Sequence, residues 1–215
     1  MAVYDLEEQE QISELKAWWE QYGKLVTTIA LAAALASVGW QGMKWYQSKQ
    51  AAEAGGLYFA VQQAARAGDA QKAREAAGKI IENYAGTTYA EMAALVSADA
   101  QVAAGDTQNA RAHLEWLAAK GSDPVLRDIA RLRLASVLLD AGSHTEALAQ
   151  LEQAPVTALA GRFADLRGDV QAAAGNTAAA RAAYQAALDA LAAGGGEGAD
   201  TLREVVRVKQ QALES

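Results

Sequence analysis

An uncharged stretch of 19 residues, from Leu25 to Met43, constrains this chain more than any other feature of its sequence. As an α-helix it would be about 28 Å long, which matches the hydrocarbon thickness of a bilayer. Aromatic residues typical of membrane interfaces flank it on both sides. They are Trp18, Trp19 and Tyr22 before it, and Trp40, Trp45 and Tyr46 at and after its far end. We therefore expect a transmembrane helix over residues 25–46, a lipid bilayer around it, and an N-terminal tail of residues 1–24.

Three other interpretations of this stretch remain open. A buried helix of a soluble protein is disfavoured because no charge interrupts the stretch over this length. A cleavable signal peptide fits Ala34-Leu35-Ala36 as a cleavage site, but it requires a short basic start, and the preceding segment is long and acidic. An interfacial helix would need a charged face, which the stretch lacks.

Small residues lie on one face of the expected span. Ala32, Ala36 and Gly39 follow one another at i, i+4 and i+7, which lets another helix approach closely. We take them as the candidate face for membrane partners, although alanine is common throughout this chain. The lysines on the two sides of the span balance each other, so the positive-inside rule does not set its orientation.

Composition limits the part of the chain after the span. From Ala51 onward there are 15 Lys and Arg against 20 Asp and Glu, a net charge of −5. Such a domain matches nucleic acid poorly. The chain has no cysteine, which excludes disulfides and thiolate chemistry. Alanine is abundant and the sequence has two prolines, so we expect an all-α domain.

This domain repeats itself. Four turns contain Gly68, Gly105, Gly142 and Gly175, which are 37, 37 and 33 residues apart. Each glycine suits the left-handed position that ends a helix, and an alanine follows five residues later where two helices would pack closely. These alanines are Ala73, Ala110, Ala147 and Ala180. A period near 34 residues with helix, tight turn and helix is typical of a tetratricopeptide solenoid.

The expected fold is therefore all-α, with one N-terminal transmembrane helix, a tetratricopeptide-like α-solenoid of about four helix pairs, and a C-terminal capping helix. The solenoid covers residues 51–193, a glycine-rich break covers 194–198, and the cap covers 199–215. Gly55-Gly56 is expected to interrupt the first long helix. The helix pairs are expected at about 57–67 with 69–84, 88–104 with 107–120, 124–141 with 144–154, and 158–174 with 177–193.

The sequence shows no catalytic constellation. His113 and His144 lack metal-ligand spacing, and the glycine clusters lack the lysine and hydroxyl of a phosphate-binding loop. We therefore expect no enzyme, no cofactor, no metal and no small-molecule substrate. A repeat domain that regulates a hidden activity is the alternative from the enzyme class.

Binding of a protein is the chemistry that this architecture offers. The first helix of each repeat pair lines one face of such a solenoid, and the turn glycines set the register. The candidate groove residues are Met92, Leu95, Asp99, Val102, Ile129, Leu132, Ser136, Leu139, Arg162, Asp165 and Asp169. The groove is apolar in the middle with acids at its rims, and suits an apolar helix or an extended segment. The C-terminal helix of the chain is a second candidate occupant.

The whole arrangement resembles the ancillary SecYEG translocon subunits of Gram-negative bacteria, the YfgM-like proteins. The resemblance is carried by the pre-span segment of residues 11–19, by Tyr22-Gly23-Lys24, by Gly39-Trp40 at the end of the span, and by residues 164–169, ADLRGD. It covers nearly the whole chain. Residues 69–84 and 194–198 match poorly.

This resemblance implies a single-pass protein of the bacterial inner membrane, with its N-terminus in the cytoplasm and its repeats in the periplasm. It also implies association with the SecYEG translocon and with PpiD, a membrane-anchored periplasmic chaperone. The implied role is to help pass secreted polypeptides to periplasmic chaperones, without catalysis. A membrane-tethered scaffold in envelope or division machinery, unrelated to secretion, remains the alternative.

Overall fold

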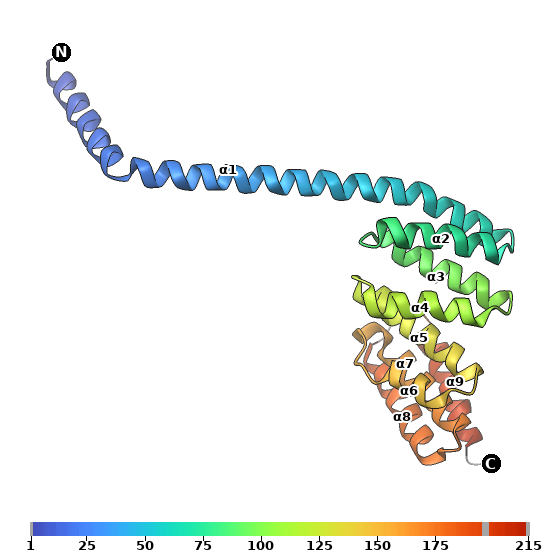
Figure 1. Ribbon diagram of the computed structural model, residues 1–215. Coiled ribbons are helices and arrows are strands. Elements are labelled where there is room, and N and C mark those ends of the chain that lie inside the picture. Colours follow the sequence, from blue (N-terminus) through green and yellow to red (C-terminus); the bar gives the residue numbers. More distant parts are fainter. Residues whose placement is uncertain (1, 195–197, 214–215) are drawn as a thin grey trace. The chain divides into compact units, whose positions relative to one another are not determined.

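The computed structural model describes residues 2–194 and 198–213, and the side chains from residue 11 onward. Every regular element in this part of the chain is a helix. Figure 1 shows the elements from α2 to α9 stacked as successive hairpins. In chain order they are α1 (Ala2–Arg66), α2 (Ala70–Tyr84), α3 (Thr88–Ala103), α4 (Thr107–Lys120), α5 (Pro124–Asp140), α6 (His144–Leu151), the 3-10 helix η1 (Thr157–Leu159), α7 (Ala160–Ala173), α8 (Thr177–Gly194) and α9 (Ala199–Ala212). The expected all-α fold is confirmed for these residues.

Contacts divide the chain into two units, Met1–Lys49 and Gln50–Ser215. Helix α1 contributes to both, because it runs without a break from Ala2 to Arg66. The predicted interruption at Gly55-Gly56 is therefore wrong. A Cβ on Gly55 would lie 3.2 Å from Cζ of Tyr89, so this glycine provides room for an aromatic ring rather than ending the helix.

The four repeat turns form as the sequence predicts. Gly68, Gly105, Gly142 and Gly175 have φ between 71° and 78°, in the left-handed region. After each glycine, the next backbone N–H bonds to a carbonyl five residues earlier, as in a Schellman motif. The pairs are Asp69 with Ala64, Asp106 with Gln101, Ser143 with Leu138, and Asn176 with Gln171. The four alanines that follow five residues after the glycines are fully buried.

Side-chain caps start several of the helices. Asp69 and Asp106 accept a backbone N–H from the first turn of α2 and α4, respectively. Asp123 accepts from Val125 and Leu126 at the start of α5, where Pro124 needs no hydrogen bond of its own. Helix α6 ends at Leu151, earlier than predicted, and Pro155 follows in the linker to η1. Its ring disfavours helical backbone at the preceding residue.

Three clusters of buried apolar side chains hold the second unit together. The first lies between α1, α2 and α3 and includes Tyr58 and Ile80. The largest extends from α3 to α7 and includes Leu114, Leu134 and Phe163. The third lies between α7, α8 and α9. Its members are Ala164, Ala180, Tyr184, Ala187 and Val206.

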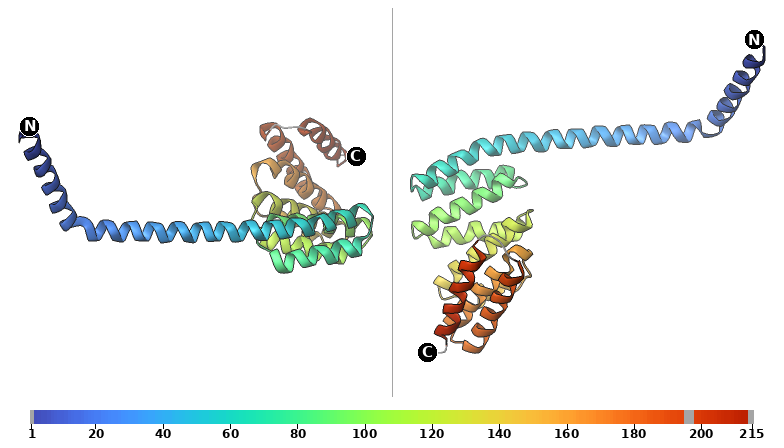
Figure 2. Two further views of the ribbon diagram at one scale, coloured as in Figure 1. Left: turned by 90° about the horizontal axis from the view of Figure 1, so that it is seen from above. Right: turned by 180° about the vertical axis from the view of Figure 1, so that it is seen from behind.

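Helix α9 packs on the last repeat pair, as Figure 2 shows in red. Its residue Val206 is fully buried in the third cluster. The predicted glycine-rich break at 194–198 falls mostly on residues outside those described: Gly194 ends α8, and Gly198, with φ of 80°, precedes α9. Residues 214 and 215 of the predicted cap also lie outside them.

Candidate protein-binding site

The first unit presents an apolar helix surface with exposed side chains. One helical stretch, Gln11–Arg66, is long and apolar enough to cross a membrane, and its most apolar window is not buried at all. Large apolar side chains are exposed along it, among them Leu25, Ile29, Leu35 and Trp40. Burial in lipid would remove this surface from water. The finding fits the predicted span in length and composition.

Polar side chains within the expected span bond to the helix itself. The hydroxyls of Thr27 and Thr28 donate to the carbonyls of Gly23 and Lys24, at 2.7 and 2.8 Å. The amide of Gln41 donates to the hydroxyl of Ser37 at 3.3 Å. Because polar groups without a partner are costly in hydrocarbon, this internal pairing makes the helix more compatible with a bilayer.

Two neighbouring clefts open along the first helices of the repeats. The larger, here named the α5–α7 cleft, has a volume of about 620 Å³. It is lined by Ile129, Leu132, Arg133, Ser136, Leu159, Arg162, Asp165, Leu166, Asp169 and Leu202. The smaller α3–α5 cleft has a volume of about 300 Å³. It includes Asp99, Val102, Arg133, Ser136 and Asp140. Arg133 and Ser136 belong to both.

Eight of the eleven predicted groove residues line these clefts. The α5–α7 cleft brings together Ile129, Leu132, Ser136, Arg162, Asp165 and Asp169, and the α3–α5 cleft adds Asp99 and Val102. The other three line neither cleft. Leu95 is buried in the core, Leu139 is partly buried against the same cluster, and Met92 packs against the cluster between α1 and α3. In the structure these three residues pack against the core clusters and do not line either cleft.

Two acids that line the α5–α7 cleft belong to an ion-pair cluster. The ammonium of Lys209, on α9, donates to Asp165 Oδ1 at 2.9 Å and to Asp169 Oδ2 at 2.7 Å. Burial raises the pKa of Asp165, and the bond to Lys209 offsets this only in part. Burial alone would lower the pKa of Lys209, but its bonds to the two carboxylates outweigh burial and raise it. The cluster is therefore a partly desolvated pair of acids with one shared cation.

Tyr184 completes this cluster from α8. Its hydroxyl donates to Asp169 Oδ1 at 2.8 Å, and its ring lies under the Lys209 ammonium, 6.0 Å from the centroid. Burial, followed by Asp169, strongly raises the pKa of the Tyr184 hydroxyl. The ring also fills the space beside Gly168, where a Cβ would lie 2.3 Å from Cε1 of the ring. The glycine is therefore required for the close packing of α7 on α8.

Three residues of the clefts and of the ion-pair cluster were not among the predicted ones, namely Arg133, Leu202 and Lys209. Arg133 donates to both carboxylate oxygens of Asp99 at 2.7 Å, which links α5 to α3 across the rim. Leu202 and Lys209 come from α9. The repeat register could have found Arg133, since it lies four residues after Ile129 and three before Ser136, on the same face of α5. Nothing in the repeat period predicts where α9 lies.

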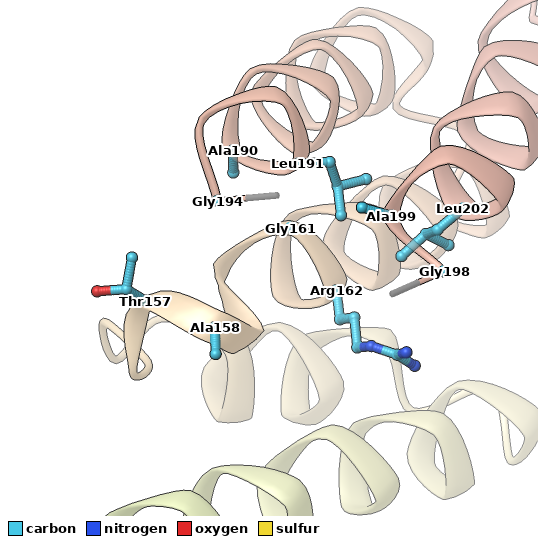
Figure 3. Close-up of a pocket in the computed structure, with 10 residues that line it drawn as sticks. All are labelled: Thr157, Ala158, Gly161, Arg162, Ala190, Leu191, Gly194, Gly198, Ala199 and Leu202. Carbon is cyan, nitrogen blue, oxygen red and sulfur yellow. The ribbon is translucent and has the colours of Figure 1, made fainter. Parts of the chain in front are cut away.

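A third cleft, of about 470 Å³, lies beside the start of α7 and is drawn in Figure 3. Leu191 projects toward Gly161, and a Cβ on that glycine would lie 2.6 Å from Leu191 Cγ. Arg162 and Leu202 line both this cleft and the α5–α7 cleft. Within the described part of the chain the Arg162 side chain forms no ion pair or hydrogen bond, so it adds an exposed cation between the two clefts.

Comparison with known protein families agrees with this helical-repeat architecture. The family model described as a tetratricopeptide repeat-like domain matches residues 16–215, nearly the whole chain. The chain belongs to this family. The tetratricopeptide repeat-like domain of this chain thus contains the helix pairs, the left-handed turn glycines and the buried turn alanines described above.

Individual relatives carry a common name. The ancillary SecYEG translocon subunit of Haemophilus influenzae is 29% identical over 185 residues, which are 86% of this chain and 90% of the relative. The proteins of the same name from Neisseria gonorrhoeae and Escherichia coli are each 27% identical, over 86% and 87% of this chain and 90% of each relative. No solved structure matches the chain. The resemblance seen in the sequence is therefore confirmed.

Proposed function

We propose that this protein is a non-catalytic, membrane-anchored adaptor that associates with the SecYEG translocon. The single observation that carries the proposal is the similarity to ancillary SecYEG translocon subunits. This similarity extends over most of the chain. An exposed apolar helix suited to a bilayer and a repeat domain with open clefts are the two parts that such an adaptor needs.

The proposed topology is a single pass through the bacterial inner membrane. Residues 1–24 lie in the cytoplasm, residues 25–46 span the bilayer, and the repeats lie in the periplasm. The absence of cysteine is compatible with an oxidising compartment. A phosphatase reporter that works only in the periplasm should be active when fused after Lys49 and inactive when fused after Glu14. The reverse pattern would contradict the topology.

The proposed role is to help pass secreted polypeptides from the translocon to periplasmic chaperones, with a PpiD-like membrane-anchored chaperone as the partner. Two surfaces of the protein bind partners in this proposal. The face with Ala32, Ala36 and Gly39 contacts membrane partners, because small residues allow close helix packing. The α3–α5 and α5–α7 clefts contact protein segments, because their floors are apolar and their rims are charged.

Site-specific crosslinking in intact membranes tests this proposal. A photoreactive amino acid replaces Leu132, which lines the α5–α7 cleft, and the control replaces Ala119, which is exposed on the second helix of its pair. We expect adducts with SecY or with a PpiD-like chaperone from position 132 and far fewer from position 119. If neither protein is among the adducts from position 132, the translocon assignment is contradicted and a scaffold in other envelope machinery is favoured.

A further inference from the structure

Helix α9 buries fewer of its residues than its neighbour α8. Of its residues, Ala199 and Val206 are buried, whereas α8 buries Ala180, Ala183, Tyr184 and Ala187. Val205 and Val208 on its outer side are 45% and 58% exposed. The side-chain contacts of α9 therefore decide how firmly the helix is held.

Those contacts follow a simple pattern. Val206 fills an apolar site against Tyr184 and Ala187, and Lys209, one turn later, bridges Asp165 and Asp169. Leu202, one turn earlier, forms a wall of the α5–α7 cleft. The helix therefore presents two apolar side chains and one cation in the order i, i+4 and i+7, all on the side that meets the solenoid.

The two acids determine what can take the place of α9. Side chains of Asp165 and Asp169 are 13% and 27% exposed, and the ammonium of Lys209 pairs with both. Partly buried carboxylates that lose their cation are strongly disfavoured. A segment that displaces α9 must therefore supply a Lys or Arg to this position as well as apolar side chains to the cleft.

We propose that α9 is a displaceable occupant of the solenoid, and that the protein segment which binds the α5–α7 cleft is an amphipathic helix with a Lys or Arg one turn after an apolar anchor. In the free protein α9 occupies the apolar site beside Tyr184 and the two acids, and it limits access to the cleft. A partner helix of the same pattern competes with it. This proposal rests on the proposed function, since it names the kind of segment that the adaptor binds and how binding is regulated.

Competition with a peptide copy of α9 tests the proposal. The probe is a fluorescent peptide of residues 198–215, and its affinity for the full-length chain in detergent micelles is measured by anisotropy. Lys209→Ala in the chain weakens the internal contact, so the peptide should bind this variant about tenfold more tightly than the wild type. Lys209→Arg keeps the cation and should bind like the wild type. Arg207→Ala is the matched control, because Arg207 is exposed and pairs with Glu204 of the same helix.

The peptide itself supplies the second comparison. A peptide with Lys209→Ala should bind the Lys209→Ala chain about tenfold more weakly than the unchanged peptide. If circular dichroism shows that the Lys209→Ala chain does not fold, Val206→Ala decides instead, because it weakens the apolar contact of α9 and should likewise raise peptide affinity. Equal affinity for all chains, or no binding to any, would overturn the proposal and leave α9 as a fixed wall.

Failure of this inference is distinguishable from failure of the proposed function. Crosslinks from Leu132 to translocon components together with no peptide exchange would reject only the displaceable helix. Peptide exchange without any crosslink to translocon components would reject the translocon assignment and retain the displaceable helix.

Discussion

The carboxylate of Glu91 accepts hydrogen bonds from the backbone N–H of Ser122 at 2.5 Å and from the Ser122 hydroxyl at 2.6 Å. Glu91 lies in the first turn of α3 and is only 1% exposed. In the next repeat, Asp128 lies 37 residues later and accepts from the backbone N–H of Val156 at 2.8 Å. A buried acid near the start of one first helix thus holds the linker that leads to the next first helix.

Loss of the Glu91 carboxylate should destabilise the repeat domain. Glu91→Ala leaves the N–H and hydroxyl of Ser122 without their acceptor, which should cost about 3 kcal/mol in the free energy of unfolding. Glu115→Ala is the control, because Glu115 is exposed and pairs with Arg111 at the surface, where the cost is about 0.5 kcal/mol. Urea unfolding of the full chain in detergent measures both. An equal loss in the two variants would contradict this role of Glu91.

Close packing at Gly168 gives a second prediction. Gly168→Ala places a methyl group 2.3 Å from a carbon of the Tyr184 ring, so α7 and α8 must separate. We expect a loss of about 2 kcal/mol in the free energy of unfolding. Gly78→Ala is the matched control within α2, because a Cβ there meets nothing within 4 Å, and it should stabilise the chain by up to about 1 kcal/mol. Thermal unfolding followed by circular dichroism should separate the two in opposite directions.

The cluster around Lys209 predicts a dependence on alkaline pH. Its carboxylate partners raise the pKa of Lys209 above the ordinary 10.5, despite the opposing effect of burial. A raised lysine pKa means that its contribution to stability is complete below 10.5 and is lost as the pH rises through the folded pKa. Lys209→Arg should abolish this loss, because a guanidinium stays charged.

Urea unfolding of the two proteins at about pH 9 and about pH 11.5 tests this dependence. Other groups that titrate in this range are shared by both proteins, so the difference between them reports on position 209. If wild type and Lys209→Arg lose the same free energy of unfolding, the ammonium does not hold α9 as described.

The small-residue face of the span should be sensitive to bulk. Ala36→Leu places a large side chain where a partner helix would approach, and should reduce the amount of SecY that co-purifies by about fivefold, equivalent to about 1 kcal/mol. Ala34→Leu, on the opposite face of the helix, is the control and should leave it unchanged. Equal effects would show that this face is not a contact.

Much of the fold follows from residues that can be read directly. The turn glycines and the alanines five residues later fix the repeat, because they combine left-handed backbone at the turn with close helix packing after it. Gly55-Gly56 misled the prediction because a glycine in a helix has two uses, as a break or as space for a neighbour. The ring of Tyr89, distant in sequence, decides between them.

Part of the candidate site could also be predicted from the sequence. Register from the turn glycines placed Leu132, Ser136 and Asp165 correctly on a cleft, because first helices share one face in every repeat. The same register put Leu95 on the groove, although the packing of α3 against α4 and α5 buries it. The position of α9 does not follow from the repeat pattern, and the structure shows it through the burial of Val206 and the contacts of Lys209 with Asp165 and Asp169.

Co-purification from native membranes measures directly whether this protein associates with the translocon. The full chain carries an affinity tag, membranes are solubilised in mild detergent, and SecY is quantified in the eluate against that of an unrelated tagged single-span protein expressed at the same level. If the protein associates with the translocon, SecY should be enriched at least roughly tenfold over this control, equivalent to about 1.4 kcal/mol of preference. SecY at the level of the control would contradict it.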